Sequence, residues 1–125
     1  MIDAIRATSA SLMTLLLTGA AWADGDAARG EARFQDCAAC HRLEAGVNNV
    51  GPSLHGIFAR KAGKLADFRY SPALKRSGIS WTPETLDAFL TNPQALVPGN
   101  RMPYAGMADA GNRADLIAYL FKASK

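Results

Sequence analysis

The chain has 125 residues, of which 49% are hydrophobic and 20% charged, and its formal net charge at pH 7 is +3. This length fits one small domain, and the absence of any nucleic-acid-binding motif argues against a nucleic-acid partner. With two cysteines in total, the chain also lacks the disulfide framework that stabilises many small exported domains.

The first 23 residues have the pattern of an export signal. Arg6 supplies a positive charge, Ala7 to Gly19 form an apolar stretch, and Ala21-Trp22-Ala23 has the form of a cleavage site. The apolar stretch is shorter than the roughly 20 residues that span a bilayer, which favours cleavage over retention as a membrane anchor. We therefore expect residues 1–23 to be removed and residues 24–125 to form one periplasmic domain without stable membrane insertion.

The segment after this signal predicts a helix over residues 27–36, because Asp26 can cap it and Gly30 and Phe34 lie four positions apart on one face. The next residues, Cys37-Ala38-Ala39-Cys40-His41, form a C-x-x-C-H motif, which is typical of c-type haem attachment. Each thiol can add to one vinyl group of haem, and the imidazole that follows can bind the iron.

Three other interpretations of the motif are weaker. A thioredoxin-type redox pair requires a βαβ context, whereas the flanks here are helical in composition. A zinc site that also uses His55 is disfavoured, because tetrahedral sites place their second ligand pair well away from the first and His41 adjoins Cys40. A disulfide would leave His41 unexplained and would close too short a loop to restrain the unfolded chain.

The middle of the chain predicts short helices separated by loops. Glycine, asparagine and proline residues between positions 46 and 52 indicate a loop. Ser71-Pro72 can start a short helix that ends near Gly78. Thr82-Pro83 is a stronger start signal, because a capping hydroxyl precedes proline at the first helical position, and Pro93 ends that helix.

The last third of the chain contains the clearest helix. Residues 93–101 predict a loop or one short turn, because Pro98-Gly99 interrupts any longer pattern. A final helix is predicted over residues 113–123, with Asn112 as its cap and Asp115 in its first turn. No alternating strand pattern of convincing length is present. The predicted fold class is all-α, with short helices and loops around the cofactor.

A second iron ligand decides whether a haem in this chain could bind a substrate. The candidates after the signal are Met102, Met107 and His55. Met102 is favoured because it lies in the rigid segment 98–103, where the backbone can aim a thioether. Met107 is the core-filling alternative. Ligation by His41 and Met102 would raise the potential and leave no open position, which favours a one-electron carrier over an enzyme.

Over essentially its whole length after the signal, the chain resembles the class I cytochromes c, both the short bacterial members and their mitochondrial relatives. The matching segments, in chain order, are Gly30 with Phe34, Cys37-Ala38-Ala39-Cys40-His41, Gly51-Pro52-Ser53-Leu54-His55-Gly56, Arg60-Lys61, Tyr70, Gly78-Ile79-Ser80-Trp81, Asn92-Pro93, Pro98-Gly99-Asn100-Arg101-Met102 and Asp115-Leu116-Ile117-Ala118-Tyr119-Leu120. The resemblance implies the cytochrome c fold, with the N- and C-terminal helices crossing around one covalent haem c.

The resemblance also implies roles for residues around the cofactor. The carbonyl of Pro52 would accept a hydrogen bond from the ring of His41, which fixes the tautomer of that ligand. Tyr70 and Trp81 would hydrogen-bond a haem propionate, and Arg60 would balance the propionate charge. His55 is expected to be an ordinary loop residue.

Several positions depart from the family pattern. Near the methionine ligand, many relatives have a tyrosine, an asparagine and a threonine, where this chain has Phe89, Leu74 and Asn100. The hydrogen bond that the tyrosine would donate to the sulfur of Met102 is then missing. Asp36 stands at one of several positions where relatives have lysines around the haem edge. We therefore expect the docking of redox partners at the haem edge to depend less on positive charge than it does in those relatives.

These observations predict a periplasmic one-electron carrier, a monomer that shuttles electrons between redox proteins and is not itself an enzyme. Two alternatives stay open. The chain could be the cytochrome partner or haem subunit of a periplasmic dehydrogenase or peroxidase system. It could also be a ligand-binding haem sensor in which Met102 is weakly bound or displaced.

Overall fold

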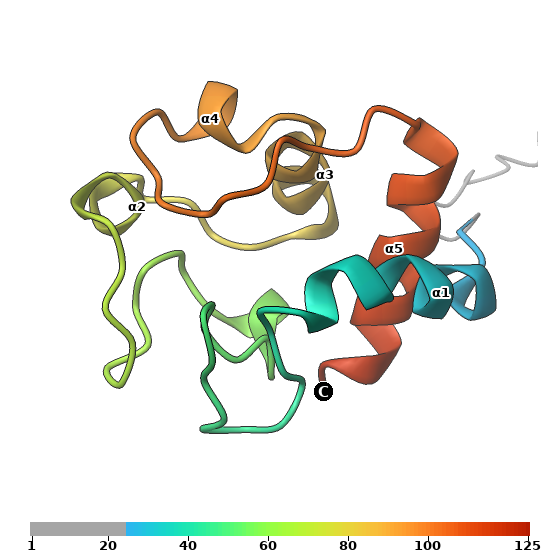
Figure 1. The fold of residues 1–125 in the computed structure, drawn as a ribbon, viewed down its shortest axis with the longest axis horizontal. Coiled ribbons are helices and arrows are strands. Elements are labelled where there is room, and N and C mark those ends of the chain that lie inside the picture. Colours follow the sequence, from blue (N-terminus) through green and yellow to red (C-terminus); the bar gives the residue numbers. More distant parts are fainter. Residues whose placement is uncertain (1–24) are drawn as a thin grey trace, which may run out of the picture.

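The computed structural model describes residues 25–125, and the predicted signal lies outside this range. Its helices are α1 (Ala27–Ala38), the 3-10 helix η2 (Ile57–Ala59), α2 (Pro72–Arg76), α3 (Pro83–Thr91), α4 (Pro93–Leu96) and α5 (Ala110–Ala123), and long loops connect them (Figure 1). The described residues form no strand, and Lys61 and Ser80 make one isolated β-bridge. The predicted all-α fold class is confirmed.

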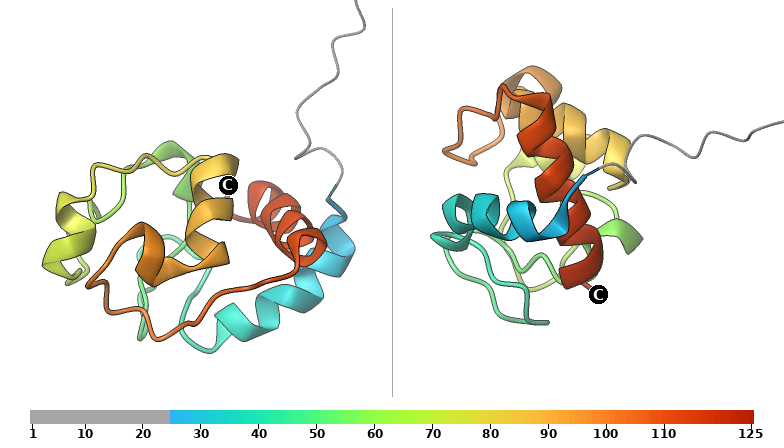
Figure 2. Two further views of the ribbon diagram at one scale, coloured as in Figure 1. Left: turned by 90° about the horizontal axis from the view of Figure 1, so that it is seen from above. Right: turned by 90° about the vertical axis from the view of Figure 1, so that its right-hand side faces the viewer.

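The first and last helices cross at one side of the molecule, as two views of the ribbon show (Figures 1 and 2). Gly30 of α1 lies at the crossing, where an added Cβ would be 1.9 Å from the backbone oxygen of Asp115. Phe34, one turn further along α1, packs its ring against Tyr119 with 5.5 Å between the ring centroids. The predicted crossing is confirmed, and glycine permits the close approach of the two backbones.

A buried carboxylate joins the two helices at this crossing. Asp115 of α5 accepts a hydrogen bond from the backbone N–H of Asp26 at 2.7 Å and another from Nε of Arg29 at 2.9 Å. The hydrogen bond from Arg29 holds the pKa of Asp115 below its ordinary value. Because its folded-state pKa is depressed, the carboxylate stabilises the fold above the unfolded pKa, and this contribution is lost as the pH falls through the folded pKa.

We expect Asp115→Asn to lower the melting temperature at pH 7, because the amide cannot form the ion pair with Arg29. The difference from the wild type should shrink between about pH 5 and pH 2, where the wild-type carboxyl is itself protonated. Thermal unfolding followed by circular dichroism at several pH values measures both effects. Glu31→Gln, at an exposed carboxylate of α1, is the control. A difference that does not vary with pH would contradict the role of the charge.

Capping side chains set the helix starts. Asp26, Ser71 and Thr82 each accept a hydrogen bond from the backbone N–H three residues further on, as predicted. The predicted cap of the last helix was wrong, because Asp109 caps α5 by accepting the N–H of Asn112 at 2.7 Å. Both side chains can cap a helix, and the sequence alone does not show that the residues between them are helical.

Two other helix boundaries differ from the sequence-based prediction. The first helix continues two residues beyond the predicted end at Asp36 and includes Cys37 in its last turn. The helix α3 ends at Thr91, and Asn92 caps the single turn of α4, which begins with Pro93 at its first position. Proline therefore starts a new turn here as well as ending the previous helix.

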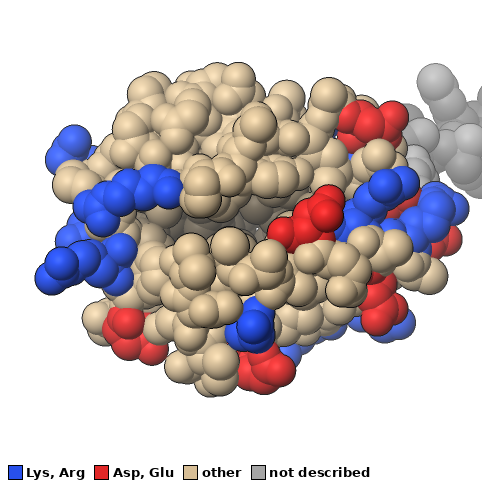
Figure 3. Space-filling model, in the orientation of Figure 1, with Lys and Arg blue, Asp and Glu red and all other residues tan. Residues whose placement is uncertain are grey.

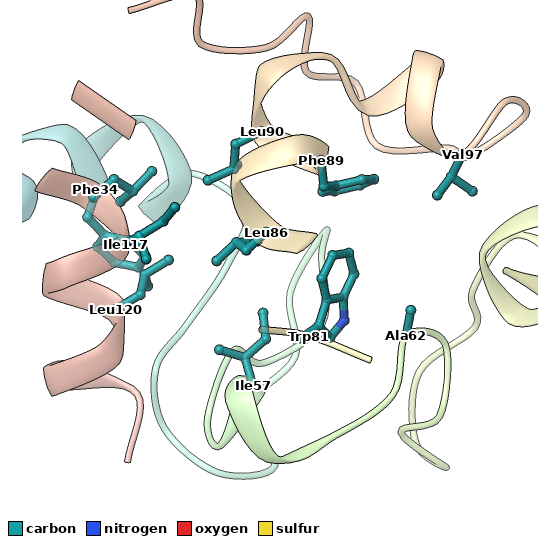
Figure 4. Packing of buried hydrophobic residues seen from close by; sticks show 11 residues of the cluster. Phe34, Ile57, Ala62, Trp81, Leu86, Phe89, Leu90, Val97, Ile117 and Leu120 are labelled. Carbon is teal, nitrogen blue, oxygen red and sulfur yellow. The ribbon is translucent and has the colours of Figure 1, made fainter. Parts of the chain in front are cut away.

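The hydrophobic core lies between α1, α3 and α5. Figure 4 shows side chains from α3 directed toward those of α5 and toward Phe34 of α1. The most completely buried members of the cluster on α5 are Leu116 and Ile117, with 0% and 1% exposure. The rings of Trp81 and Phe89 meet edge to face at 5.1 Å between centroids. Among the described helices, none has both the length and the apolarity needed to span a bilayer.

Candidate haem-binding site

A cavity of about 340 Å³ lies between α3, the loop after α4 and the loops that follow α1, and the hollow opens to solvent in Figure 3. Its wall is formed mainly by apolar side chains. Every residue predicted for the site lines this cavity: Cys37, Cys40, His41, Met102, Pro52, Arg60, Tyr70, Trp81 and Phe89. Two rejected ligand candidates are placed elsewhere, because His55 is exposed and Met107 packs against the core outside the lining.

The end of α1 presents the two thiols to this cavity. The backbone N–H groups of Cys40 and His41 both donate to the carbonyl of Cys37, at 3.0 and 2.9 Å, so the motif forms a tight turn. Burial raises the pKa of the Cys37 thiol to about 11. A redox-active cysteine requires a lowered pKa, so this environment disfavours the thioredoxin-type interpretation. The described residues also contain no cluster of three or more His, Cys, Asp or Glu side chains that could hold a metal ion.

The imidazole of His41 is held in one orientation. Its Nδ1 lies 2.7 Å from the carbonyl oxygen of Pro52, so Nδ1 carries the proton and donates, as the resemblance implied. Nε2 is then left with its lone pair. Burial lowers the pKa of His41, which keeps the ring neutral at pH 7. A neutral ring with one bonded nitrogen and one free lone pair is suited to bind a metal.

Gly51 is a site residue that the sequence interpretation did not single out. A Cβ at this position would lie 2.3 Å from Cε1 of His41. Any larger residue would therefore displace the imidazole from its place beside Pro52. The sequence shows a glycine directly before that proline, but only the fold places this glycine against the imidazole ring.

The opposite part of the lining comes from α3 and the loop after α4. Phe89 is buried and packs on Trp81, and its side chain has no hydroxyl that could bind a sulfur. Leu74 and Asn100 also line the cavity. The amide of Asn100 donates to the carbonyls of Pro93 and Val97, at 3.0 and 2.9 Å. The polar side chain at this position is thus engaged with the backbone.

Polar groups interrupt the apolar wall at a few points. Arg60 is half buried and donates from Nη2 to the carbonyl of Ser53. Tyr70 is buried, with its ring 4.9 Å from that of Phe68, and burial raises the pKa of its phenol, which therefore remains a hydrogen-bond donor. One arginine and two aromatic donors, with Trp81 as the second, suit the acidic edge of a largely apolar planar cofactor.

Few charges border the mouth of the cavity. In Figure 3 the surface around the hollow is mostly uncharged, with a carboxylate on one side and basic side chains toward the other. Four exposed charged residues line the cavity. Three of them are basic, Lys61, Arg69 and Arg101, and one is acidic, Asp36.

Comparison with known proteins agrees with this geometry. The sequence model of the Cytochrome c family matches residues 27–124. Cytochrome c2 iso-2 of Magnetospirillum fulvum is 47% identical over 87 residues, which cover 70% of this chain and 91% of that protein. Cytochrome c2 of Agrobacterium tumefaciens (strain II Chrys) is 46% identical over 106 residues, covering 81% of this chain and 96% of that protein.

A solved structure has the same fold. Cytochrome cH from Methylobacterium extorquens matches with a TM-score of 0.74 and 44% sequence identity, covering 78% of this chain and 99% of that one. The chain therefore belongs to the cytochrome c family, and Cys37 and Cys40 are the pair through which it holds a covalent haem c.

Proposed function

We propose that this protein carries single electrons between redox proteins of the periplasm, with His41 and Met102 as the axial ligands of its haem iron. The family assignment supports the electron-carrier role. One observation carries the ligand assignment. The same cavity is lined by an imidazole, a thioether and both thiols, drawn from two distant segments of the chain, while His55 and Met107 lie outside its lining.

Different residues of the cavity would have different roles in binding a haem. A bound haem supplies an iron that alternates between the ferric and ferrous states. His41, oriented by Pro52, would bind that iron through its free ring nitrogen, and Met102 would bind it through its sulfur. With both positions filled, a substrate has nowhere to bind, which favours a carrier over an enzyme. Arg60, Tyr70 and Trp81, the polar residues of the lining described above, suit the propionate edge.

Absorption spectra of the purified holoprotein test the ligand assignment. The oxidised protein should be low-spin and should show the weak far-red band of thioether ligation, and the reduced protein should resist carbon monoxide. A high-spin spectrum at neutral pH, or ready binding of carbon monoxide, would contradict the proposal. Those results would favour the ligand-binding sensor instead.

The location in the periplasm rests on the sequence of residues 1–23. We propose that this segment is removed after export and that residues 24–125 function as a monomer. Mass spectrometry of the protein isolated from its host should find Asp24 at the N-terminus, and gel filtration should give the size of a single chain. A retained Met1 would show that the segment is not cleaved.

The charged residues at the rim of the cavity predict how the rate of electron transfer depends on ionic strength. We expect oxidation of the reduced protein by hexacyanoferrate(III) to depend weakly on salt, because Asp36 at the mouth of the cavity offsets part of the positive charge of the basic residues in the lining. Asp36→Lys should raise the rate at low ionic strength about threefold or more and steepen its fall with salt. Glu31→Lys makes the same charge change on α1 outside the cavity lining. Equal effects of the two variants would contradict a local role for the rim.

Phe89→Tyr should raise the midpoint potential. The hydroxyl of the new tyrosine would donate a hydrogen bond to the sulfur of Met102. This bond would draw electron density from the thioether and favour ferrous iron. A hydrogen bond stronger by about 1 kcal/mol in the ferrous state gives about 40 mV for a one-electron couple. Redox titration of the variant and the wild type measures the shift. An unchanged potential would show that this position does not reach the ligand.

A further inference from the structure

The loop that carries Met102 is held by the side-chain amide of Asn100. This side chain is buried, with 7% exposure of the residue. Its Nδ2 donates to the carbonyls of Pro93 and Val97, at 3.0 and 2.9 Å, and its Oδ1 accepts the backbone N–H of Met102 at 3.0 Å. One amide therefore ties the backbone of Met102 to both ends of α4.

A second amide side chain reinforces the same turn. Gln94 accepts the N–H of Gly99 on Oε1 at 3.2 Å and donates from Nε2 to the carbonyl of Asn100 at 2.8 Å. Gly99 has a φ of +85°, in the left-handed region that favours glycine. The conformation just before Met102 is thus specified by two side chains and a glycine.

The other end of the loop is anchored to α3 and α5. The N–H of Met107 donates to the carbonyl of Leu90 at 2.7 Å. Arg113, which is buried, donates from Nη1 to the carbonyls of Met107 and Ala108, at 2.8 and 2.9 Å, and from Nε to Asp87 at 2.8 Å. The backbone on both sides of Met102 is therefore restrained.

Phe89 supplies no hydrogen bond to the thioether, so the position of the sulfur depends on the backbone that carries it. Asn100 is the residue whose side chain bonds directly to the backbone of Met102. We propose that Asn100 is a positioning residue that keeps Met102 on the haem iron and so weakens the binding of external ligands in its place. This inference rests on the ligation of iron by Met102 in the proposed function.

The chemistry of the asparagine side chain is specific for this task. Two N–H donors and one carbonyl acceptor are needed at once, and an amide of this length supplies them. Asn100→Asp keeps the shape but loses both donors, and Asn100→Ala loses all three bonds. In either variant the carbonyls of Pro93 and Val97 lose a side-chain donor, although each still accepts a backbone N–H. In Asn100→Ala the backbone N–H of Met102 also loses the side-chain oxygen that accepts its hydrogen bond.

Imidazole binding to the oxidised holoprotein tests the proposal, because imidazole competes with the thioether for iron. Titrations followed by absorption should show about tenfold tighter binding in both Asn100 variants than in the wild type, as expected for the loss of a buried hydrogen bond. The far-red band of thioether ligation should weaken in parallel. Gln94→Ala, at an exposed residue, should shift the affinity in the same direction by about threefold.

Asn92→Ala is the matched control. Asn92 is an exposed asparagine that caps the same helix by accepting the N–H of Ala95 at 3.2 Å. Its removal weakens the cap of α4 and should leave imidazole affinity unchanged. Equal affinities in the Asn92 and Asn100 variants would overturn the proposal. If neither Asn100 variant folds, a Gln94→Ala affinity equal to that of the wild type would overturn it.

The wild-type spectrum separates this inference from the proposed function. Without the far-red band, Met102 is not a ligand and both proposals fail together. If the band is present and the Asn100 variants bind imidazole as the wild type does, the positioning role alone fails.

Discussion

Replacing Met102 by alanine is expected to open one side of the haem iron. The oxidised variant should lose its far-red band and gain high-spin character, and the reduced variant should bind carbon monoxide readily. Its midpoint potential should fall by on the order of 100 mV, because the thioether is the ligand that raises the potential. Absorption spectroscopy, carbon monoxide titration and redox titration of one preparation measure all three effects.

Met107→Ala is the matched control for this variant. Met107 is partly buried against the core but does not line the cavity. Its truncation should cost roughly 2 kcal/mol of stability, as for a methionine that fills a core, and should leave the spectrum unchanged. A Met107 variant that binds carbon monoxide, with a Met102 variant that does not, would reverse the ligand assignment.

Gly30→Ala is expected to destabilise the fold severely. The new Cβ would lie 1.9 Å from the backbone oxygen of Asp115 and 2.8 Å from Cβ of Tyr119, so one helix must move away from the other. Overpacking of this kind costs about 3 kcal/mol, which lowers the melting temperature of a domain of this size by at least about 10 °C. Thermal unfolding of the holoprotein measures the loss.

Ala32→Gly controls for the intrinsic difference between the two residues. Ala32 is exposed on the same helix, so its replacement by glycine should cost about 1 kcal/mol through helix propensity alone. The expected signs are therefore informative, because alanine should be worse than glycine at position 30 and better at position 32. A Gly30→Ala protein as stable as the wild type would show that α1 and α5 do not pack this closely.

Local chemistry determined much of this protein. The attachment motif consists of five consecutive residues, so the covalent haem could be predicted from Cys37 to His41 alone. Capping also depends on neighbours in the chain, and the starts of α1, α2 and α3 were predicted correctly. The last helix was the exception, since Asp109 and Asn112 are both suitable caps and contacts of Arg113 with the preceding loop and α3 accompany the earlier start.

Long-range contacts decided the rest. From the sequence, Asn100 was only a departure from the family pattern near Met102, whereas the fold shows its amide bonded to three backbone groups around Met102. Gly51 gained a role only because the loop returns against the ring of His41. A sequence can specify residue chemistry and local caps, because these depend on adjacent residues. Which backbone a side chain meets depends on how separate segments pack, and that is set by the tertiary structure.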